Sequence, residues 1–157
     1  MNLTITKRVF TSLAAICVLL SGTFMAQNAL AQEGARLTGT ETFKDFGGKA
    51  GLEKIIDTFW LNLQEEPTMK PFFTETDSVN FKKQLVDQTC EIMNGGCEYK
   101  GGKMKPIHAG HLIKREHFNA LVEQLQKAMT THNVPFASQN KLLAALAPMH
   151  RDIVTKQ

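Results

Sequence analysis

Apolar residues recur at helical spacing in four stretches of the chain. In residues 49–63 they follow Leu52 at intervals of 3, 4, 7, 8 and 11 positions, which places them on one face of an α-helix. The same spacing occurs in three further stretches, residues 79–94, 115–132 and 138–153. Because no segment alternates apolar and polar residues as a half-buried strand does, the chain is predicted to be all-α.

Residues that cap or break helices separate these stretches. Asp77 or Ser78 is expected to cap the second helix and Ser138 the last one, while Pro148 should kink that last helix. Residues 97–113 contain glycines and a proline that prevent a long helix, yet they are too apolar for a solvated loop. Four wide apolar faces leave an interior that side chains could fill or that could hold a flat hydrophobic ligand.

The first 31 residues differ from the rest, since they contain no Asp or Glu. Lys7 and Arg8 precede an apolar run from Val9 to Leu20, and Ala29-Leu30-Ala31 provides the small-x-small pattern that signal peptidase cleaves. This is the layout of a secretory signal peptide. The alternative is an uncleaved membrane anchor, but the run of about 12 residues is short of the ~20 that span a bilayer. We therefore expect cleavage after Ala31, a periplasmic or secreted protein, and no stable membrane insertion after cleavage.

The remaining chain is predicted to consist of a flexible lead-in, residues 32–42, and one folded domain, residues 43–155. With 43% hydrophobic and 21% charged residues, the 157-residue chain has the composition of a globular protein. Its net charge of +3, which falls to +1 when the signal peptide is removed, is too small to indicate nucleic acid as a partner. Export would place Cys90 and Cys97 in an oxidising compartment, where we expect a disulfide; a reactive thiol is the alternative.

Five histidines offer candidate chemistry. His117, His132 and His150 are expected at a helix edge, at a helix C-terminus and on the surface, respectively. His108 lies among apolar residues of the irregular segment, with no acidic residue near it in sequence, and a neutral imidazole is a good ligand for iron or zinc. His111 could complete half of a zinc site, although no third ligand stands at a familiar spacing.

An ordered set of short motifs extends along the same region: Phe46-Gly47-Gly48, Phe59-Trp60, Phe72-Phe73-Thr74-Glu75-Thr76-Asp77, Gly95-Gly96, Tyr99-Lys100-Gly101-Gly102-Lys103-Met104, His108-Ala109-Gly110, Glu116-His117-Phe118, Val134-Pro135 and Leu146-Ala147-Pro148-Met149. In this order the sequence resembles a group I truncated haemoglobin over about residues 43–155. The resemblance implies a shortened globin fold, a two-over-two helical sandwich, around one haem b. It also implies reversible binding of oxygen or another diatomic gas. Nitric oxide dioxygenation is a variant of this function and needs a reductant.

Position by position, the resemblance makes His108 the proximal ligand of the haem iron. It places Phe73 against the porphyrin and Met104 on the proximal side. An apolar loop with one histidine agrees with these roles, since it provides an imidazole inside a dry pocket. His111 stands where the family has glycine or an apolar residue, which leaves an exchange of the two histidines as an alternative.

The gas-binding side departs from the family pattern. Trp60 stands where the family commonly has a tyrosine whose hydroxyl hydrogen-bonds the gas, and an indole can only donate through its N–H; a plain core role is the alternative. An ungapped match brings Phe81, Gln84 and Leu85 nearest the gas, and a shift of a few residues would bring in Gln88. Because residues 79–94 contain no histidine, we expect a five-coordinate or water-ligated iron unless a Lys or Gln side chain binds.

Three functions are therefore weighed. The resemblance favours a haem protein that binds oxygen or another diatomic gas, including nitric oxide. The second is a non-haem periplasmic helical binding or adaptor module, and the third is a small thiol- or metal-dependent enzyme built on Cys90 and His108. No reductase domain occurs in the sequence, so a reductant for the iron would be a separate partner.

Overall fold

A computed structural model describes residues 35–156 of the chain. Its elements, in chain order, are α2 (Glu41–Asp45), α3 (Gly48–Glu65), α4 (Lys70–Phe73), α5 (Ser78–Ile92), α6 (Met104–His108), α7 (Arg115–Thr131), α8 (Phe136–Leu146), the 3-10 turn η1 (Ala147–Met149) and α9 (His150–Ile153). These residues contain no strand, which confirms the all-α prediction. The predicted signal peptide, residues 1–31, lies outside the described residues.

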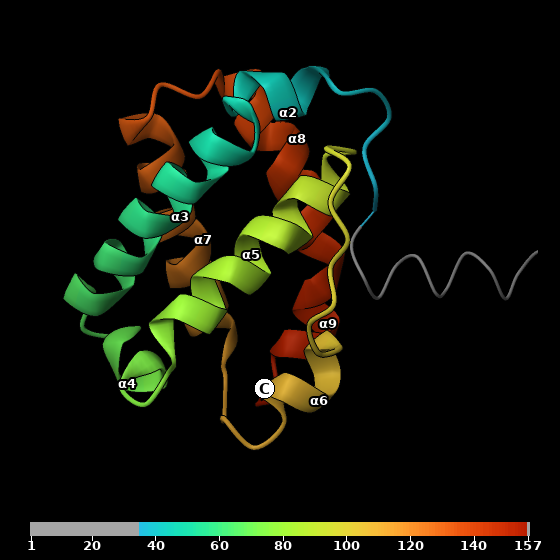
Figure 1. Cartoon of the computed structure of the whole chain (residues 1–157). Coiled ribbons are helices and arrows are strands. Elements are labelled where there is room, and N and C mark those ends of the chain that lie inside the picture. Colours follow the sequence, from blue (N-terminus) through green and yellow to red (C-terminus); the bar gives the residue numbers. More distant parts are fainter. Residues whose placement is uncertain (1–34, 157) are drawn as a thin grey trace, which may run out of the picture.

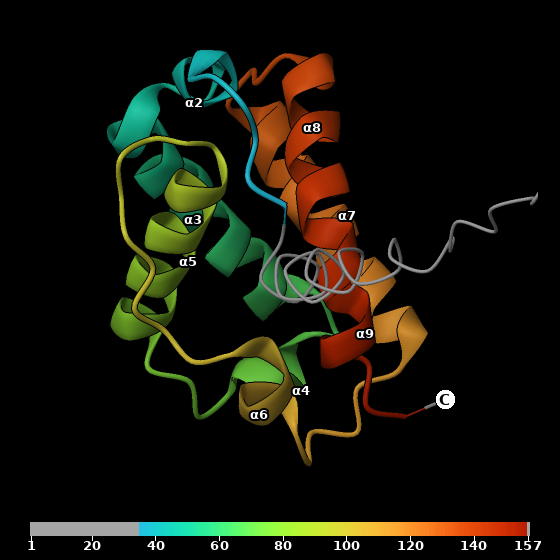
Figure 2. The same ribbon diagram turned by 90° about the vertical axis from the view of Figure 1, so that its right-hand side faces the viewer.

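The long helices form two layers. Figure 1 shows α5 crossing in front of the molecule beside α3, with α7 and α8 behind them. In the view turned by 90°, α3 and α5 lie on one side and α7 and α8 on the other (Figure 2). Helix α3 packs most extensively on α5 and α7, so it joins the two layers. This arrangement is the predicted two-over-two helical sandwich.

The predicted apolar stripe of α3 forms the centre of the core. Five of its six apolar residues are buried, namely Leu52, Ile55, Ile56, Phe59 and Leu63. Burial of such a side chain contributes about 1.5–3 kcal/mol to folding. The sixth, Trp60, is only half-buried, which leaves its ring at the border of the core.

Two glycines allow helices to approach one another closely. A Cβ on Gly51 would lie 1.9 Å from the carbonyl oxygen of Phe46, so α2 and α3 could not meet as they do with any other residue there. A Cβ on Gly95 would lie 2.6 Å from the ring of Phe43. The turn after α5 can therefore approach the Phe43 ring of α2 this closely because it carries a glycine.

The cap predictions have mixed outcomes. Asp77 caps α5 as expected, because its carboxylate accepts the backbone N–H groups of Val79 and Asn80 at 3.0 and 3.1 Å. The prediction for Ser138 is wrong: α8 begins at Phe136, and the buried Ser138 hydroxyl inside this helix donates to the carboxylate of Asp45. The polar group is therefore used for a contact between helices instead of a cap.

The C-terminal helix and the irregular segment also differ in detail from expectation. Pro148 does not bend a continuous helix as predicted. It lies in the 3-10 turn η1, which separates the end of α8 from the start of α9. The segment 97–113 contains the five-residue helix α6, and Met104 is buried at its start. The segment is thus only partly withdrawn from solvent, as its apolar composition predicted for Met104, since Ile107 is 46% and Leu112 63% exposed. No helix in residues 35–156 is long and apolar enough to cross a membrane.

Candidate haem site

His108 is the last residue of α6, a helix that extends only from Met104 to His108. Its imidazole folds back along this short helix, so that Nδ1–H donates to the carbonyl oxygen of Met104 at 2.7 Å. Burial lowers the pKa of His108 below its usual 6.5; the bond to Met104 opposes this effect and the nearby His111 adds to it. The imidazole is therefore neutral near pH 7.

A neutral imidazole whose Nδ1–H is bound to a carbonyl keeps its Nε2 lone pair available. This is how ligating histidines are usually oriented, with the other ring nitrogen held by a backbone carbonyl or carboxylate. Residues 35–156 contain no cluster of three or more His, Cys, Asp or Glu side chains that could hold a metal ion by themselves. The donor set thus suits a group that brings its own remaining ligands, as a porphyrin does, and needs one imidazole from the protein.

Three aromatic side chains from three helices form a second group of predicted site residues. Trp60 of α3 lies with its ring centroid 6.0 Å from that of Phe73 in α4 and 5.3 Å from that of Phe81 in α5. Phe73 and Phe81 are 5.2 Å apart. All three rings are half-buried. The three predicted site residues are thus neighbours, and they form an apolar wall with only the indole N–H as a polar group.

One face of α5 continues from this aromatic cluster. Gln88, two turns after Phe81, is only 7% exposed, and its Nε2 lies 3.9 Å from the sulfur atoms of both Met104 and Met149. Thioether sulfur is a weak acceptor, so this buried amide is poorly satisfied. The contact places Gln88 beside the start of α6, whereas Phe81 contacts Trp60. The same face of α5 therefore borders both the aromatic cluster around Trp60 and the start of α6, the helix that carries His108.

The remaining predicted residues of α5 lie between these two contacts. Leu85 is half-buried and packs against the core. The Oε1 atom of Gln84 is buried without a hydrogen-bond partner, while its Nε2 lies 3.4 Å from the Asn80 side chain. Buried polar atoms without partners are uncommon in folded proteins. Gln84 and Gln88 thus leave hydrogen-bonding capacity along the face of α5 that a bound group could use.

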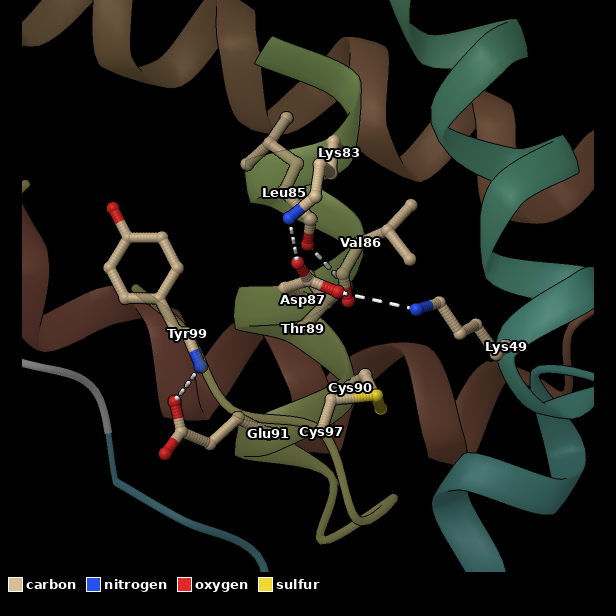
Figure 3. Close-up of a disulfide and its surroundings, with 10 residues drawn as sticks. All are labelled: Lys49, Lys83, Leu85, Val86, Asp87, Thr89, Cys90, Glu91, Cys97 and Tyr99. Atoms are coloured by element: carbon tan, nitrogen blue, oxygen red, sulfur yellow. Dashed lines mark hydrogen bonds and ion pairs between the residues drawn. A yellow bond between two sulfur atoms is a disulfide. The ribbon is translucent and has the colours of Figure 1, made fainter. Parts of the chain in front are cut away.

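A cysteine pair connects α5 with the segment that leads to α6. The structure bonds Cys90, buried in α5, to Cys97, with their Cα atoms 5.7 Å apart. Next to it, the Glu91 carboxylate accepts the backbone N–H of Tyr99 at 2.9 Å (Figure 3). Both connections hold the beginning of this segment against α5, nine to eleven residues before His108.

A second feature of Figure 3 is an ion-pair network on the outer face of α5. Its Asp87 carboxylate lies 2.8 Å from the Lys83 ammonium and 3.4 Å from that of Lys49 in α3. The hydrogen bond from Lys83 is the main reason why the pKa of Asp87 is below its usual value. The network ties α5 to α3.

Sequence reasoning placed two of the other histidines well and missed the environment of the third. His117 lies at the edge of α7 and accepts the backbone N–H of Lys114, and His132 ends that helix as expected. The prediction that His150 is on the surface is wrong. Its ring is half-buried, 5.0 Å from the ring of Phe118. Met149 beside it belongs to the Leu146-Ala147-Pro148-Met149 motif, but its contact with Gln88 was not predicted.

A two-layer helical sandwich with one neutral, carbonyl-oriented imidazole and an apolar aromatic wall has the features expected of a helical haem protein of the globin class. The model of the family described as bacterial-like globin matches residues 41–155. The chain therefore belongs to this family and is a haem-binding, gas-binding globin.

Individual relatives agree with this assignment. A group 1 truncated haemoglobin of Mycolicibacterium paratuberculosis is 29% identical over 109 residues, which cover 69% of this chain and 80% of the relative. One of Nostoc commune is 25% identical over 114 residues, covering 73% and 97%. The crystal structure of the Tetrahymena pyriformis truncated haemoglobin in its Fe(III) form matches with a TM-score of 0.70 at 24% identity, covering 73% of this chain and 98% of that one.

Proposed function

We propose that His108 is the proximal protein ligand of a haem b iron and that the chain reversibly binds oxygen or a similar diatomic gas there. The observation that carries this proposal is the orientation of the imidazole, in which Nδ1 is bound to the Met104 carbonyl and Nε2 makes no hydrogen bond to any of residues 35–156. When bound, a haem supplies a ferrous iron that binds such gases reversibly. His111 is less suited to this role because its side chain is exposed.

The other predicted residues would hold and shield the group. The rings of Phe73 and Phe81 and the side chain of Leu85 provide an apolar surface that excludes water, and Met104 lies one helical turn before His108. Exclusion of water strengthens each polar contact inside such a pocket. The pocket we infer is therefore closed by apolar side chains, with Gln84 and Gln88 as its polar exceptions.

The gas-binding side favours reversible binding over chemistry on the gas. Trp60 carries no hydroxyl, and its neighbours in the cluster, Phe73 and Phe81, cannot donate a hydrogen bond. A gas in this position would thus receive at most the indole N–H and an amide of α5. We infer weak hydrogen bonding to oxygen, which makes nitric oxide dioxygenation the less favoured variant. With no histidine in α5, the iron would be five-coordinate or water-ligated.

We also propose that the chain is exported to the periplasm or secreted, with residues 1–31 as a cleaved signal peptide. The N-terminal pattern of two basic residues, an apolar run and a small-x-small end supports this. In an oxidising compartment the Cys90–Cys97 pair would be a stable disulfide. The iron would then need a reductant outside the cytoplasm.

Reconstitution with haem tests the proposed function. We expect the purified protein to bind haem stoichiometrically with a shifted Soret band, and His108→Ala to lose this binding, whereas His111→Ala keeps it. Imidazole added to the His108→Gly variant should restore the ferric and ferrous spectra of the wild type. Absence of a Soret shift in the wild type would favour the non-haem adaptor module, and retention in His108→Ala with loss in His111→Ala would exchange the two histidines.

A further inference from the structure

The end of the molecule that carries His108 is strongly basic. Residues 103–116 and 150–156, which we call the basic end, contain six basic side chains and two acidic ones, a formal charge of +4. The basic side chains are Lys103, Lys105, Lys114, Arg115, Arg151 and Lys156, and the acidic ones are Glu116 and Asp152. The rest of residues 35–156 has a formal charge of −2. The charge of the described chain is thus separated between this end and the remainder.

The two parts of the basic end form one surface. Helix α9 packs on α6, and the backbone N–H groups of Thr155 and Lys156 donate to the carbonyl oxygen of Ile113 at 2.9 and 3.0 Å. Figures 1 and 2 both show α6, the loop that follows it and the C-terminal end side by side at the lower end of the molecule. Cations from both segments would therefore act together on any molecule that approaches this surface.

Most of these cations have no partner within the described chain. Lys114 pairs with Glu116 at 3.1 Å, but Lys103, Lys105 and Arg115 have no carboxylate within 4 Å among residues 35–156. On α3 and α5 the situation differs, because three of their four lysines, Lys49, Lys82 and Lys83, are paired with Asp57 or Asp87. The positive charge of the basic end is therefore available to a partner.

Exposed apolar side chains lie within this positive surface. Ile107 and Leu112 are two of the five large hydrophobic side chains that are strongly exposed in the described residues, and they flank His108 and His111. Leu112 is held in the left-handed region, at φ 50°, which is unfavourable for a leucine. Apolar side chains surrounded by charged ones are the usual composition of a small docking surface.

We propose that the basic end is the docking surface for an acidic electron-carrier protein that reduces the iron held by His108; this rests on the proposed function. One electron would pass from the reduced carrier to ferric iron, giving ferrous iron and the carrier oxidised by one electron, and no bond of the chain forms or breaks. Complementary charge would steer the encounter, and complexes of this kind need only a small contact area. An anionic membrane fits less well, because α6, with five residues, is too short for an amphipathic membrane helix.

Flavodoxin, a small acidic one-electron carrier, serves as the probe. Its affinity for the purified protein would be measured by calorimetry between 20 and about 500 mM salt, a range over which surface charges become screened. We expect Lys103→Glu/Lys105→Glu/Arg115→Glu to lose affinity by about tenfold or more at low salt. The matched control Lys54→Glu/Lys127→Glu/Lys141→Glu, which makes the same change of net charge with exposed lysines elsewhere, should bind like the wild type.

Stopped-flow reduction of the haem-loaded protein by reduced flavodoxin gives the second readout, and its second-order rate constant should fall in parallel with affinity. Equal loss of affinity in both triple variants would overturn the proposal, because net charge alone would then explain binding. Tight binding to phosphatidylglycerol vesicles without binding to flavodoxin would overturn it in favour of a membrane. Unchanged flavodoxin affinity with weaker haem retention would assign the cations to the haem carboxylates. Flavodoxin binding by a protein that takes up no haem would refute the proposed function and the reduction step, and would leave only the docking surface supported.

Discussion

Replacement of Trp60 by tyrosine would place a hydroxyl group in a cluster that has none. Trp60 lies in α3, and its ring contacts Phe73 and Phe81 at centroid distances of 6.0 and 5.3 Å. A tyrosine ring is smaller but keeps the aromatic character of the position, and because the side chain is half-buried we expect a loss of only about 1 kcal/mol of stability. The substitution therefore tests the chemistry of the gas-binding side without dismantling it.

The expected gain follows from one hydrogen bond. A neutral hydrogen bond contributes about 0.5–1.5 kcal/mol net, and about 1.4 kcal/mol corresponds to a factor of ten in an equilibrium or rate constant. We therefore expect Trp60→Tyr to slow oxygen dissociation about three- to tenfold. Carbon monoxide, which accepts hydrogen bonds poorly, should dissociate at a nearly unchanged rate.

Stopped-flow gas replacement on the haem-loaded protein measures these rates, and the C–O stretching frequency reports the polarity around the gas independently. Trp60→Phe is the matched control, because it removes the indole N–H without adding a hydroxyl. If Trp60→Tyr released oxygen as fast as Trp60→Phe, the side chain at position 60 would not reach the gas and our account of the apolar gas-binding side would be wrong. An oxygen release from Trp60→Phe much faster than from the wild type would show that the indole N–H already donates.

Three further changes test the packing around the site. Replacing Cys90 and Cys97 by alanine should lower the free energy of unfolding by about 2.5 kcal/mol, the chain-entropy value for so short a ring; a loss under 1 kcal/mol in urea titration would contradict this. Gln88→Met should raise the thermal midpoint of the haem-free protein by a few degrees, because a poorly bonded buried amide costs about 1 kcal/mol or more; destabilisation would show that the amide is satisfied. The hydrogen bond from Lys83 lowers the pKa of Asp87. The stability that this carboxylate contributes is therefore fully present above its usual pKa of 3.8 and is lost as the pH falls through the lower pKa of the folded protein. Asp87→Asn should therefore cost about 0.5–1 kcal/mol at pH 7 and weaken the pH dependence of unfolding below pH 4, since its partner is largely exposed.

The helices were predictable because their signal is repeated along the chain. Each turn of α3 adds another apolar residue on the same face, so a single unusual residue does not obscure the period. Caps depend on one side chain and were less predictable. Asp77 binds its own helix, whereas Ser138 finds Asp45, a partner 93 positions away in sequence that no local pattern can reveal.

In the candidate site, too, local signals were predictable and contacts between distant residues were not. His108 could be singled out because it is the histidine with apolar neighbours in an irregular segment, and the motifs around it resemble a known family. The contact of Gln88 with Met104 and Met149 joins residues 16 and 61 positions apart. Such a contact depends on how α5 crosses the C-terminal helices, and the apolar period of each helix leaves that crossing undetermined.

The short length of α6 explains why one segment can serve both a dry pocket and a docking surface. In five residues the chain passes from the buried Met104 to the exposed Ile107 and the half-buried His108. A longer helix would bury its inner face over several turns and set the imidazole farther from solvent. Here His108, whose ring Nδ1–H is held by the Met104 carbonyl, directly follows Ile107, whose exposed side chain a partner can touch. An electron donor docked on this surface would thus be near the proposed iron ligand without entering the gas-binding side around Trp60.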